Sequence, residues 1–346
     1  MDLRFADDAF GKTPELRYAL QLYQAGFLES ARDHLNALLG QAEIADQVGF
    51  YLVLINEALS GRDGAGWTLN LPAGGPPLWE MDWIRRVFGP VVTAEIVDDR
   101  SGVAADRSLI VDYGLGAEKD LYYRRNFEHG VRQVLIHLGD ERYDDSCSAY
   151  RWCRRVYRNI WSPILANIGH VTFFPLGYKT GFAQASDRER TAAERNHLWS
   201  FAGDANKSTR AEMLAQMRAV PGGHEHLISG WDSADSLPTE HYRGLLDQSV
   251  FAPCPAGNSI LDSFRVCEAL EAGCIPIVER RPGYDYFQRL MPGHPMPTIS
   301  HWSEGRSLVA ALAARDACEP LRQTCSTWWA AHKQQLIDRV AADLAA

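Results

Sequence analysis

The sequence lacks any long hydrophobic run, and no stretch approaches the roughly 20 apolar residues that a membrane-spanning helix requires. Its first ten residues include acidic side chains and no apolar core, so we expect no secretory signal. Cysteine is sparse, with 7 residues that form no Cys-x-x-Cys pair. This spacing suggests neither a disulfide framework nor a zinc site, and we expect a cytoplasmic protein with reduced, buried thiols and no transmembrane segment.

Basic residues are outnumbered by acidic ones. The chain has 35 Lys and Arg and 44 Asp and Glu, which give a net charge of −9. This balance argues against nucleic acid as a partner, but it is compatible with a local basic pocket for a phosphorylated ligand. The composition, 46% hydrophobic and 23% charged, excludes wholesale disorder and a coiled coil. The length of 346 residues suggests roughly two domains.

Residues 1–62 predict an N-terminal helical extension, since Leu16, Leu20, Phe27 and Leu35 recur at helical spacings. The pair of helices resembles one tetratricopeptide-type unit, but the period does not recur downstream. The Gly- and Pro-rich residues 61–77 predict a linker or long loop.

From about residue 79, short apolar runs alternate with helical patterns, which indicates parallel sheets in an α/β fold. The expected strands are 91–97, 108–111, 133–138, 171–174, 198–202, 227–229, 249–252 and 274–278, and the expected helices are 150–165, 209–217, 263–272, 284–290 and a C-terminal stretch 308–344 broken near Pro320. The polar residues 183–196 separate two series of strands. We therefore expect an N-terminal domain at 63–190 and a C-terminal domain at 191–346, facing each other across a cleft.

Residues 249–278 carry the most information. They predict a strand, a Pro- and Gly-containing loop, a helix begun by Asp262 or Ser263, and a second strand. Arg265 and Glu268 are three residues apart, so they share one helix face. A surface helix with an ion pair one turn apart would give the same spacing.

The same residues predict a phosphate site. Backbone N–H groups of the loop, with the N-terminus of the helix, favour an anion, and Arg265 could neutralise its charge. Glu268 lies further along the helix, within reach of sugar hydroxyls. The predicted binding residues here are Gly257, Asn258, Ser259, Ser263, Arg265 and Glu268.

This segment resembles the signature of exostosin-type glycosyltransferases, which combine a Pro-x-Gly loop, a Ser-x-Arg-x-x-Glu-Ala-Leu helix and a Gly-Cys-Ile-Pro strand. The chain carries these motifs at residues 255–257, 263–270 and 273–276. Residues 197–213 are similar to the segment that opens the donor domain of that family, and they add Lys207 and Arg210 as phosphate-binding candidates, with a solvated helix start as the alternative. Residues 173–179 also resemble a family element, to which we assign no catalytic role.

The resemblance implies a GT-B type fold of two Rossmann-like domains, the N-terminal one for the acceptor and the C-terminal one for the donor. It further implies an inverting transferase that moves a sugar from a nucleotide-sugar, with UDP as the expected nucleotide, to a glycan or polyol acceptor. The lack of a signal or anchor in the sequence differs from the membrane-anchored animal exostosins, so we expect the enzyme to act in bacterial surface polysaccharide synthesis. Asp98-Asp99 is not a DxD motif. We therefore expect no metal and no cofactor, with helix dipole and basic side chains stabilising the leaving diphosphate.

The catalytic base is expected at the end of an apolar strand, where residues 133–141 carry His137, Asp140 and Glu141. Asp140 or Glu141 would remove the proton of the acceptor hydroxyl, and His137 would be a partner of that carboxylate. Simple capping of the following helix is the alternative for both carboxylates.

Residues 150–161 predict a basic, aromatic helix with Arg151, Arg154, Arg155 and Arg158 on one side, which could meet a phosphorylated acceptor or be an ordinary solvated face. A catalytically inactive nucleotide-sugar-binding or scaffold protein of the same fold is the alternative to an enzyme.

Overall fold

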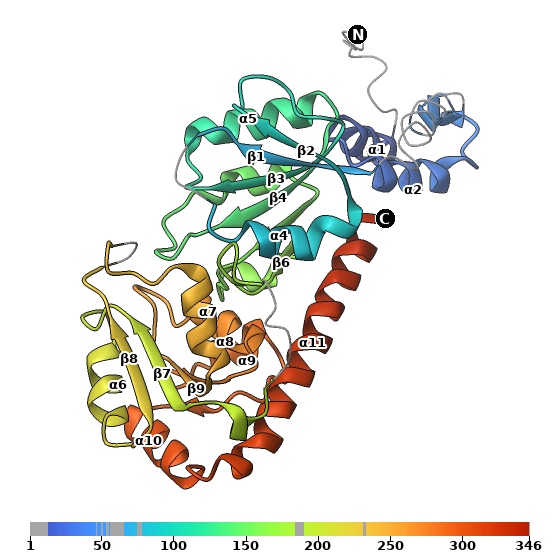
Figure 1. Cartoon of the computed structure of the whole chain (residues 1–346). Coiled ribbons are helices and arrows are strands. Elements are labelled where there is room, and N and C mark those ends of the chain that lie inside the picture. The colour runs from blue at the N-terminus through green and yellow to red at the C-terminus, as the bar shows by residue number, and fades with distance from the viewer. Residues whose placement is uncertain are drawn as a thin grey trace. The chain divides into compact units, whose positions relative to one another are not determined.

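The structure, a computed structural model, describes residues 13–45, 47–49, 51–52, 55, 66–74, 78–183, 190–230 and 233–345 (Figure 1). The chain forms two compact units. Unit 1 comprises Met1–Gly74, Val92–Ile136 and Ser146–Val156, and unit 2 comprises Gly75–Val91, His137–Asp145 and Tyr157–Ala346. The domain boundaries predicted at residues 62 and 190 lie in or beside undescribed residues, and they stay predictions.

Unit 1 begins with two helices, α1 (Pro14–Gln24) and α2 (Leu28–Leu38). The Thr13 hydroxyl caps α1 by accepting the N–H of Leu16 at 3.2 Å, and Pro14 occupies a first-turn position that needs no N–H donor. Gly26, with a φ of +75°, forms the turn between the helices. Their buried leucines form one core cluster, so the predicted helix pair is present.

The first sheet has the strand order β2-β1-β3-β4-β5-β6. Its strands are β1 (Trp67–Pro72), β2 (Val92–Asp98), β3 (Arg107–Tyr113), β4 (Arg132–Leu138), β5 (Arg155–Arg158) and β6 (Val171–Phe173), and helices α4 (Met81–Phe88) and α5 (Ala117–Glu128) belong to the same half of the chain. β1 pairs in parallel with β2 and β3.

Strand β1 corrects the prediction of a loop over 61–77. Within the described part of that segment, Trp67 and Leu69 alternate with polar residues and both are buried. This period of two is the pattern of a strand. The Gly and Pro residues on either side concealed it.

The helix predicted over 150–165 is wrong. Residues Cys147–Trp152 form a 3₁₀-helix, β5 follows, and a second 3₁₀-helix covers Leu165–Asn167. Backbone N–H groups of Arg154 and Asn159 donate to the carbonyls of Gln133 and His137, so this stretch pairs with β4 instead of with itself. Pro163 further disfavours a helix. The predicted row of four arginines therefore does not exist, and Arg158 points inward and is buried.

The second sheet lies in unit 2, with the order β11-β10-β9-β7-β8 (Figure 1). Its strands are β7 (His197–Gly203), β8 (Gly223–Leu227), β9 (Ser249–Cys254), β10 (Ile275–Glu279) and β11 (Thr298–Ile299), and its helices are α6 (Arg210–Met217), α7 (Thr239–Asp247), α8 (Phe264–Glu271), α9 (Tyr286–Leu290) and α10 (Trp302–Ala311). All four strand pairs are parallel. The α/β class with two parallel sheets is thus confirmed. Strand β8 lies earlier than its predicted position at 227–229, and β11 and α7 correspond to no predicted element.

The C-terminal helix α11 (Arg315–Ala345) runs through Pro320 without the predicted break. The interruption comes instead at residues 312–314, between α10 and α11. Pro320 lies near the start of α11, where few intrahelical bonds are lost. Among the described residues, no helix combines the length and apolarity needed to cross a membrane.

Candidate active site

A cavity of about 450 Å³ opens within unit 2, a volume typical of small-molecule sites. Three adjacent strands contribute to it at their carboxyl ends: Gly203 ends β7, Ile228 follows β8, and Gly257 follows β9. In an open parallel sheet this is the edge where ligands bind. The wall is lined by Trp79, Glu141, Leu176, Lys179, Ala202, Gly203, Asp204, Lys207, Arg210, His226, Ile228, Ser236, Leu237, Thr239, Tyr242, Gly257, Asn258, Asp262, Ser263, Phe264, Arg265 and Glu268.

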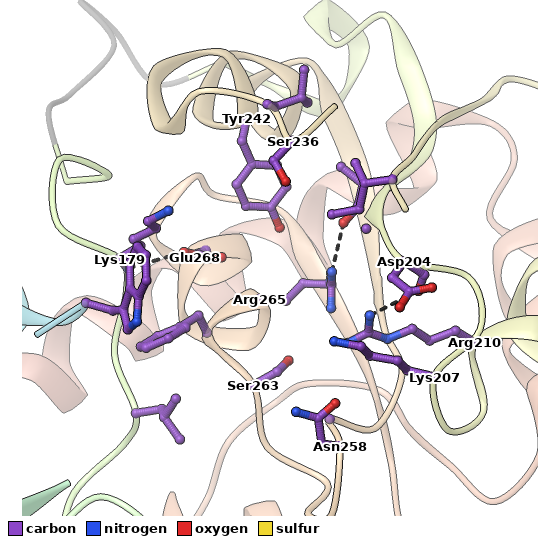
Figure 2. Close-up of a pocket in the computed structure, with 18 of the residues that line it drawn as sticks. Lys179, Asp204, Lys207, Arg210, Ser236, Tyr242, Asn258, Ser263, Arg265 and Glu268 are labelled. Carbon is purple, nitrogen blue, oxygen red and sulfur yellow. Dashed lines mark hydrogen bonds between the residues drawn. The ribbon is translucent and has the colours of Figure 1, made fainter. Parts of the chain in front are cut away.

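Two guanidinium groups lie close together in the cavity. Figure 2 shows Arg265 in the middle of the pocket, with Arg210 and Lys207 to one side. Arg265 donates from Nη2 to the Ala202 carbonyl at 2.8 Å, and Arg210 donates from Nη1 to the Asp204 carbonyl at 3.0 Å. Among the described residues, neither buried Nε atom has a hydrogen-bond partner.

The two arginines also repel each other. Burial, followed by the positive charge of Arg265, lowers the pKa of Arg210 to about 10. Gly203 lets the arginine approach the chain closely, because a Cβ there would lie 2.8 Å from Nη2 of Arg265. Buried like charges favour an anionic ligand beside these two groups.

The loop that follows β9 differs in detail from the predicted phosphate cradle. The N–H of Gly257 donates to the Ile260 carbonyl at 2.9 Å, so it is not available to a ligand. A Cβ on Gly257 would lie 2.6 Å from the carbonyl oxygen of Asp262, which explains the glycine. Asn258 lines the cavity, whereas Ser259 is exposed and does not.

Helix α8 begins at the cavity. Ser263 is its N-cap, but its hydroxyl makes no capping bond, and its buried Oγ has no partner among the described residues. Asp262 accepts the N–H of Ser263 at 2.8 Å through Oδ1, while Oδ2 is buried without such a partner. Burial raises the pKa of Asp262 to about 7.

Glu268 lies at the opposite end from Lys207 and Arg210 (Figure 2). Its side chain accepts the backbone N–H of Lys179 at 3.2 Å, and burial raises its pKa to about 7. The residue is only 5% exposed.

The structure separates the two candidate bases. Glu141 lines the cavity, and burial raises the pKa of its carboxyl, opposed by a hydrogen bond with Asn258 and by the charge of Lys207. Asp140 is buried and is not among the lining residues. It pairs with Arg158 and accepts the backbone N–H groups of Asp144 and Asp145 at 3.0 and 3.2 Å.

His137 belongs to the network that holds this segment. Its Nδ1 lies 2.9 Å from Nη1 of Arg158, which can only donate, so Nδ1 accepts and Nε2 donates to Asp145 at 2.8 Å. Burial lowers the pKa of His137, in keeping with this neutral form. Carboxylate oxygens of Asp140, Asp144 and Asp145 lie within 4.8 Å of one another, but Asp140 and Asp145 are already engaged in these contacts.

Several lining residues carry no predicted role. Lys179 stacks on Trp79, with Nζ 4.4 Å from the ring centroid, and Tyr242 adds a further aromatic side chain to the wall. Lys179 lies in the family-like segment 173–179 and could have been suspected. Trp79 and Tyr242 come from elements distant in sequence, and no spacing rule identifies them.

No known family model matches the chain, and no curated protein is similar in sequence. Similar solved structures include an α1,3-fucosyltransferase (9% identity, TM-score 0.47, covering 80% of this chain and 91% of that one). HepE from Anabaena in complex with UDP has 10% identity and a TM-score of 0.47, and covers 80% of this chain and 99% of HepE. HepE in complex with UDP-glucose has 11% identity and a TM-score of 0.45, and covers 80% of this chain and 98% of HepE. A complex of the fucosyltransferase with GDP-fucose has 10% identity, covers 75% of this chain and 82% of that one, and has a TM-score of 0.44.

Proposed function

We propose that the cavity of unit 2 binds the donor of a glycosyltransferase of the GT-B type, a nucleoside diphosphate sugar. One observation carries the proposal. Lys207 and Arg210 lie at one end of a cavity at the carboxyl edge of a parallel sheet, Arg265 lies in its middle, and the buried carboxylate of Glu268 lies at the other end. Cations facing a hydroxyl-binding carboxylate match the charge pattern of a diphosphate joined to a ribose.

In this assignment the diphosphate contacts Lys207 and the guanidinium groups of Arg210 and Arg265. Glu268 accepts hydrogen bonds from ribose hydroxyls. The aromatic side chains of Trp79, Tyr242 and Phe264 form an apolar wall against which the nucleobase of the donor packs. UDP is the nucleotide we propose, on the exostosin resemblance of residues 249–278.

The reaction we propose is a direct displacement with inversion. The acceptor oxygen bonds to the anomeric carbon, the bond from that carbon to the diphosphate breaks, and its electron pair leaves with the diphosphate. Glu141 takes the acceptor proton, a task that suits a carboxyl whose pKa burial raises towards neutrality. The three cations stabilise the departing diphosphate, so we propose turnover without a metal. The same resemblance favours a glycan or polyol acceptor in bacterial surface polysaccharide synthesis.

The test is release of nucleoside diphosphate from a panel of UDP- and GDP-sugars, followed with and without EDTA. We expect Glu141→Gln to slow turnover by about 10²–10⁴-fold with little change in donor affinity. The matched control is Glu118→Gln, an equal change on an exposed position of α5 in unit 1, which should turn over normally.

Asp140→Asn separates the two carboxylates. Because it removes the charge that pairs with buried Arg158, we expect a loss of about 3–5 kcal/mol in the free energy of unfolding. Full stability with turnover abolished would instead make Asp140 the base. Loss of all activity in EDTA, restored by manganese, would contradict the metal-free reaction, and donor binding without any release would favour an inactive nucleotide-sugar-binding protein.

A further inference from the structure

An exposed tyrosine follows the proposed base by two residues. Tyr143 is 45% exposed and has a φ of +58°, a backbone conformation that bulky residues rarely adopt. A hydrogen bond from its Oη to the Trp161 carbonyl, at 2.9 Å, holds the ring in place. The chain therefore accepts local strain and leaves a large aromatic ring at the surface beside Glu141.

Two more aromatic residues pack close to this ring, the buried Trp161 and the half-buried Tyr284. The Trp161 ring lies 5.5 Å from that of Tyr284, and the backbone N–H of Trp161 donates to Oη of Tyr286 at 3.3 Å. Tyr284 stands in a tight turn, where it exchanges backbone hydrogen bonds of 2.9 and 3.1 Å with Arg281. We call the exposed Tyr143 and the half-buried Tyr284, together with the buried Trp161 that contacts both, the aromatic shelf. All three belong to unit 2, as the cavity does.

The shelf adjoins the cavity through Asp262. This buried carboxyl lines the cavity together with Glu141, two residues before Tyr143. Burial, followed by smaller effects that include the charge of Asp262, raises the pKa of the Tyr143 hydroxyl. The exposed guanidinium of Arg281 interacts in turn with Tyr143 and Tyr284. A ligand on the shelf would thus lie close to Glu141 and to the exposed Arg281, the turn partner of Tyr284.

We propose that the aromatic shelf binds the acceptor as a saccharide, with Arg281 contacting an anionic substituent of that sugar. The C–H face of a sugar ring packs against the electron-rich face of an aromatic ring, and hydroxyl groups at its rim remain free to reach Glu141. A carboxylate or a phosphate would satisfy the guanidinium equally. The inference rests on the proposed function, because the shelf can present an acceptor only if Glu141 is the base that deprotonates it.

The experiment measures binding of three probes by saturation-transfer NMR in the presence of UDP: a p-nitrophenyl β-glucoside, the corresponding β-glucuronide, and glucose 6-phosphate. Tyr143→Gly removes the ring at a position whose φ suits glycine, and Tyr284→Ala removes a second ring. We expect each to weaken binding of the anionic probes about tenfold while UDP affinity changes less than twofold. The matched control, Tyr18→Ala, removes an equally exposed tyrosine from unit 1 and should have no effect.

Arg281→Ala should weaken the glucuronide or the phosphate probe and leave the neutral glucoside unchanged, and the stronger of the two effects identifies the anionic group. Unaltered saccharide binding in both tyrosine variants, or no saccharide binding by a wild-type protein that binds UDP, would overturn the shelf and leave the donor site standing. Equal binding of neutral and anionic probes would overturn the role of Arg281. Tyr143→Phe keeps the ring but loses the hydrogen bond to Trp161, so it should bind more tightly than Tyr143→Gly and no more tightly than the wild type.

Discussion

Asp262 is the residue whose ionisation opposes folding most plainly. Its Oδ2 is buried without a partner among the described residues, and burial raises the pKa of the carboxyl to about 7. In the unfolded chain an aspartate has a pKa near 4. The folded state therefore holds the proton over a range where the unfolded state has lost it, and stability falls as pH rises through this range.

We expect Asp262→Asn to remove much of this pH dependence. Between pH 5 and 8, the wild type should lose about 2–3 kcal/mol more of its free energy of unfolding than the variant, since one pKa unit corresponds to about 1.4 kcal/mol. Urea unfolding at several pH values measures it. Ser263→Ala is the matched control, because it alters the neighbouring side chain without a titrating group. Parallel stability curves for the wild type and Asp262→Asn would contradict the assignment.

At the scale of elements, the two loops at the cation end are joined by one carboxylate. Glu279, the last residue of β10, accepts the Ala256 N–H at 3.3 Å through Oε1, and the same atom accepts the Trp302 indole N–H at 2.7 Å. It also accepts the hydroxyl of Thr209, directly before α6. Glu279 does not line the cavity, so it acts by positioning residues that do.

Glu279→Ala is expected to weaken UDP binding about tenfold, because the loops that carry Lys207 and Asn258 lose their common anchor. Hydrogen exchange over residues 204–209 and 255–259 should speed up in the same variant. Glu279→Gln keeps an accepting oxygen and should lie close to the wild type. If the alanine variant binds UDP normally and its loops exchange at the wild-type rate, Glu279 has no such role.

The elements that could be predicted are those whose own sequence determines them. The mainly apolar run 133–138 forms strand β4, which is buried on both faces. A run of this kind is the sequence pattern of a strand in the middle of a parallel sheet, so the strand could be predicted. The arginines at 151–158 have a helical spacing, yet β5 forms there, since pairing with β4 and burial of Arg158 against Asp140 outweigh local periodicity. Contacts with β4 and Asp140 determine the conformation of this segment, and the local sequence does not reveal those contacts.

The same distinction holds for the candidate site. Arg265 and Glu268 share a helix face, so their common position in the cavity follows from spacing and from the family resemblance. Lys207, Arg210 and Asn258 line the same cavity from neighbouring strand ends. Trp79 and Glu279 could not be found in this way, because their roles depend on contacts between residues far apart in the chain.

At the scale of the whole molecule, two electrostatic effects on an anionic ligand oppose each other. The net charge of −9 repels it, and the basic residues of the cavity attract it. The overall field repels UDP, so its affinity must arise from the local donors. Binding should consequently depend on individual cations in the cavity and hardly at all on equal charges elsewhere on the surface.

Calorimetric titration of UDP into the wild type and two variants tests this most directly. Lys207→Ala and Arg306→Ala each remove one positive charge, the first from the cavity wall and the second from an exposed position on α10. We predict that the wild type and Arg306→Ala bind UDP alike, and that Lys207→Ala binds at least tenfold more weakly with unchanged stability. Equal weakening in both variants, or no binding of UDP by the wild type, would contradict a nucleotide-sugar site in this cavity.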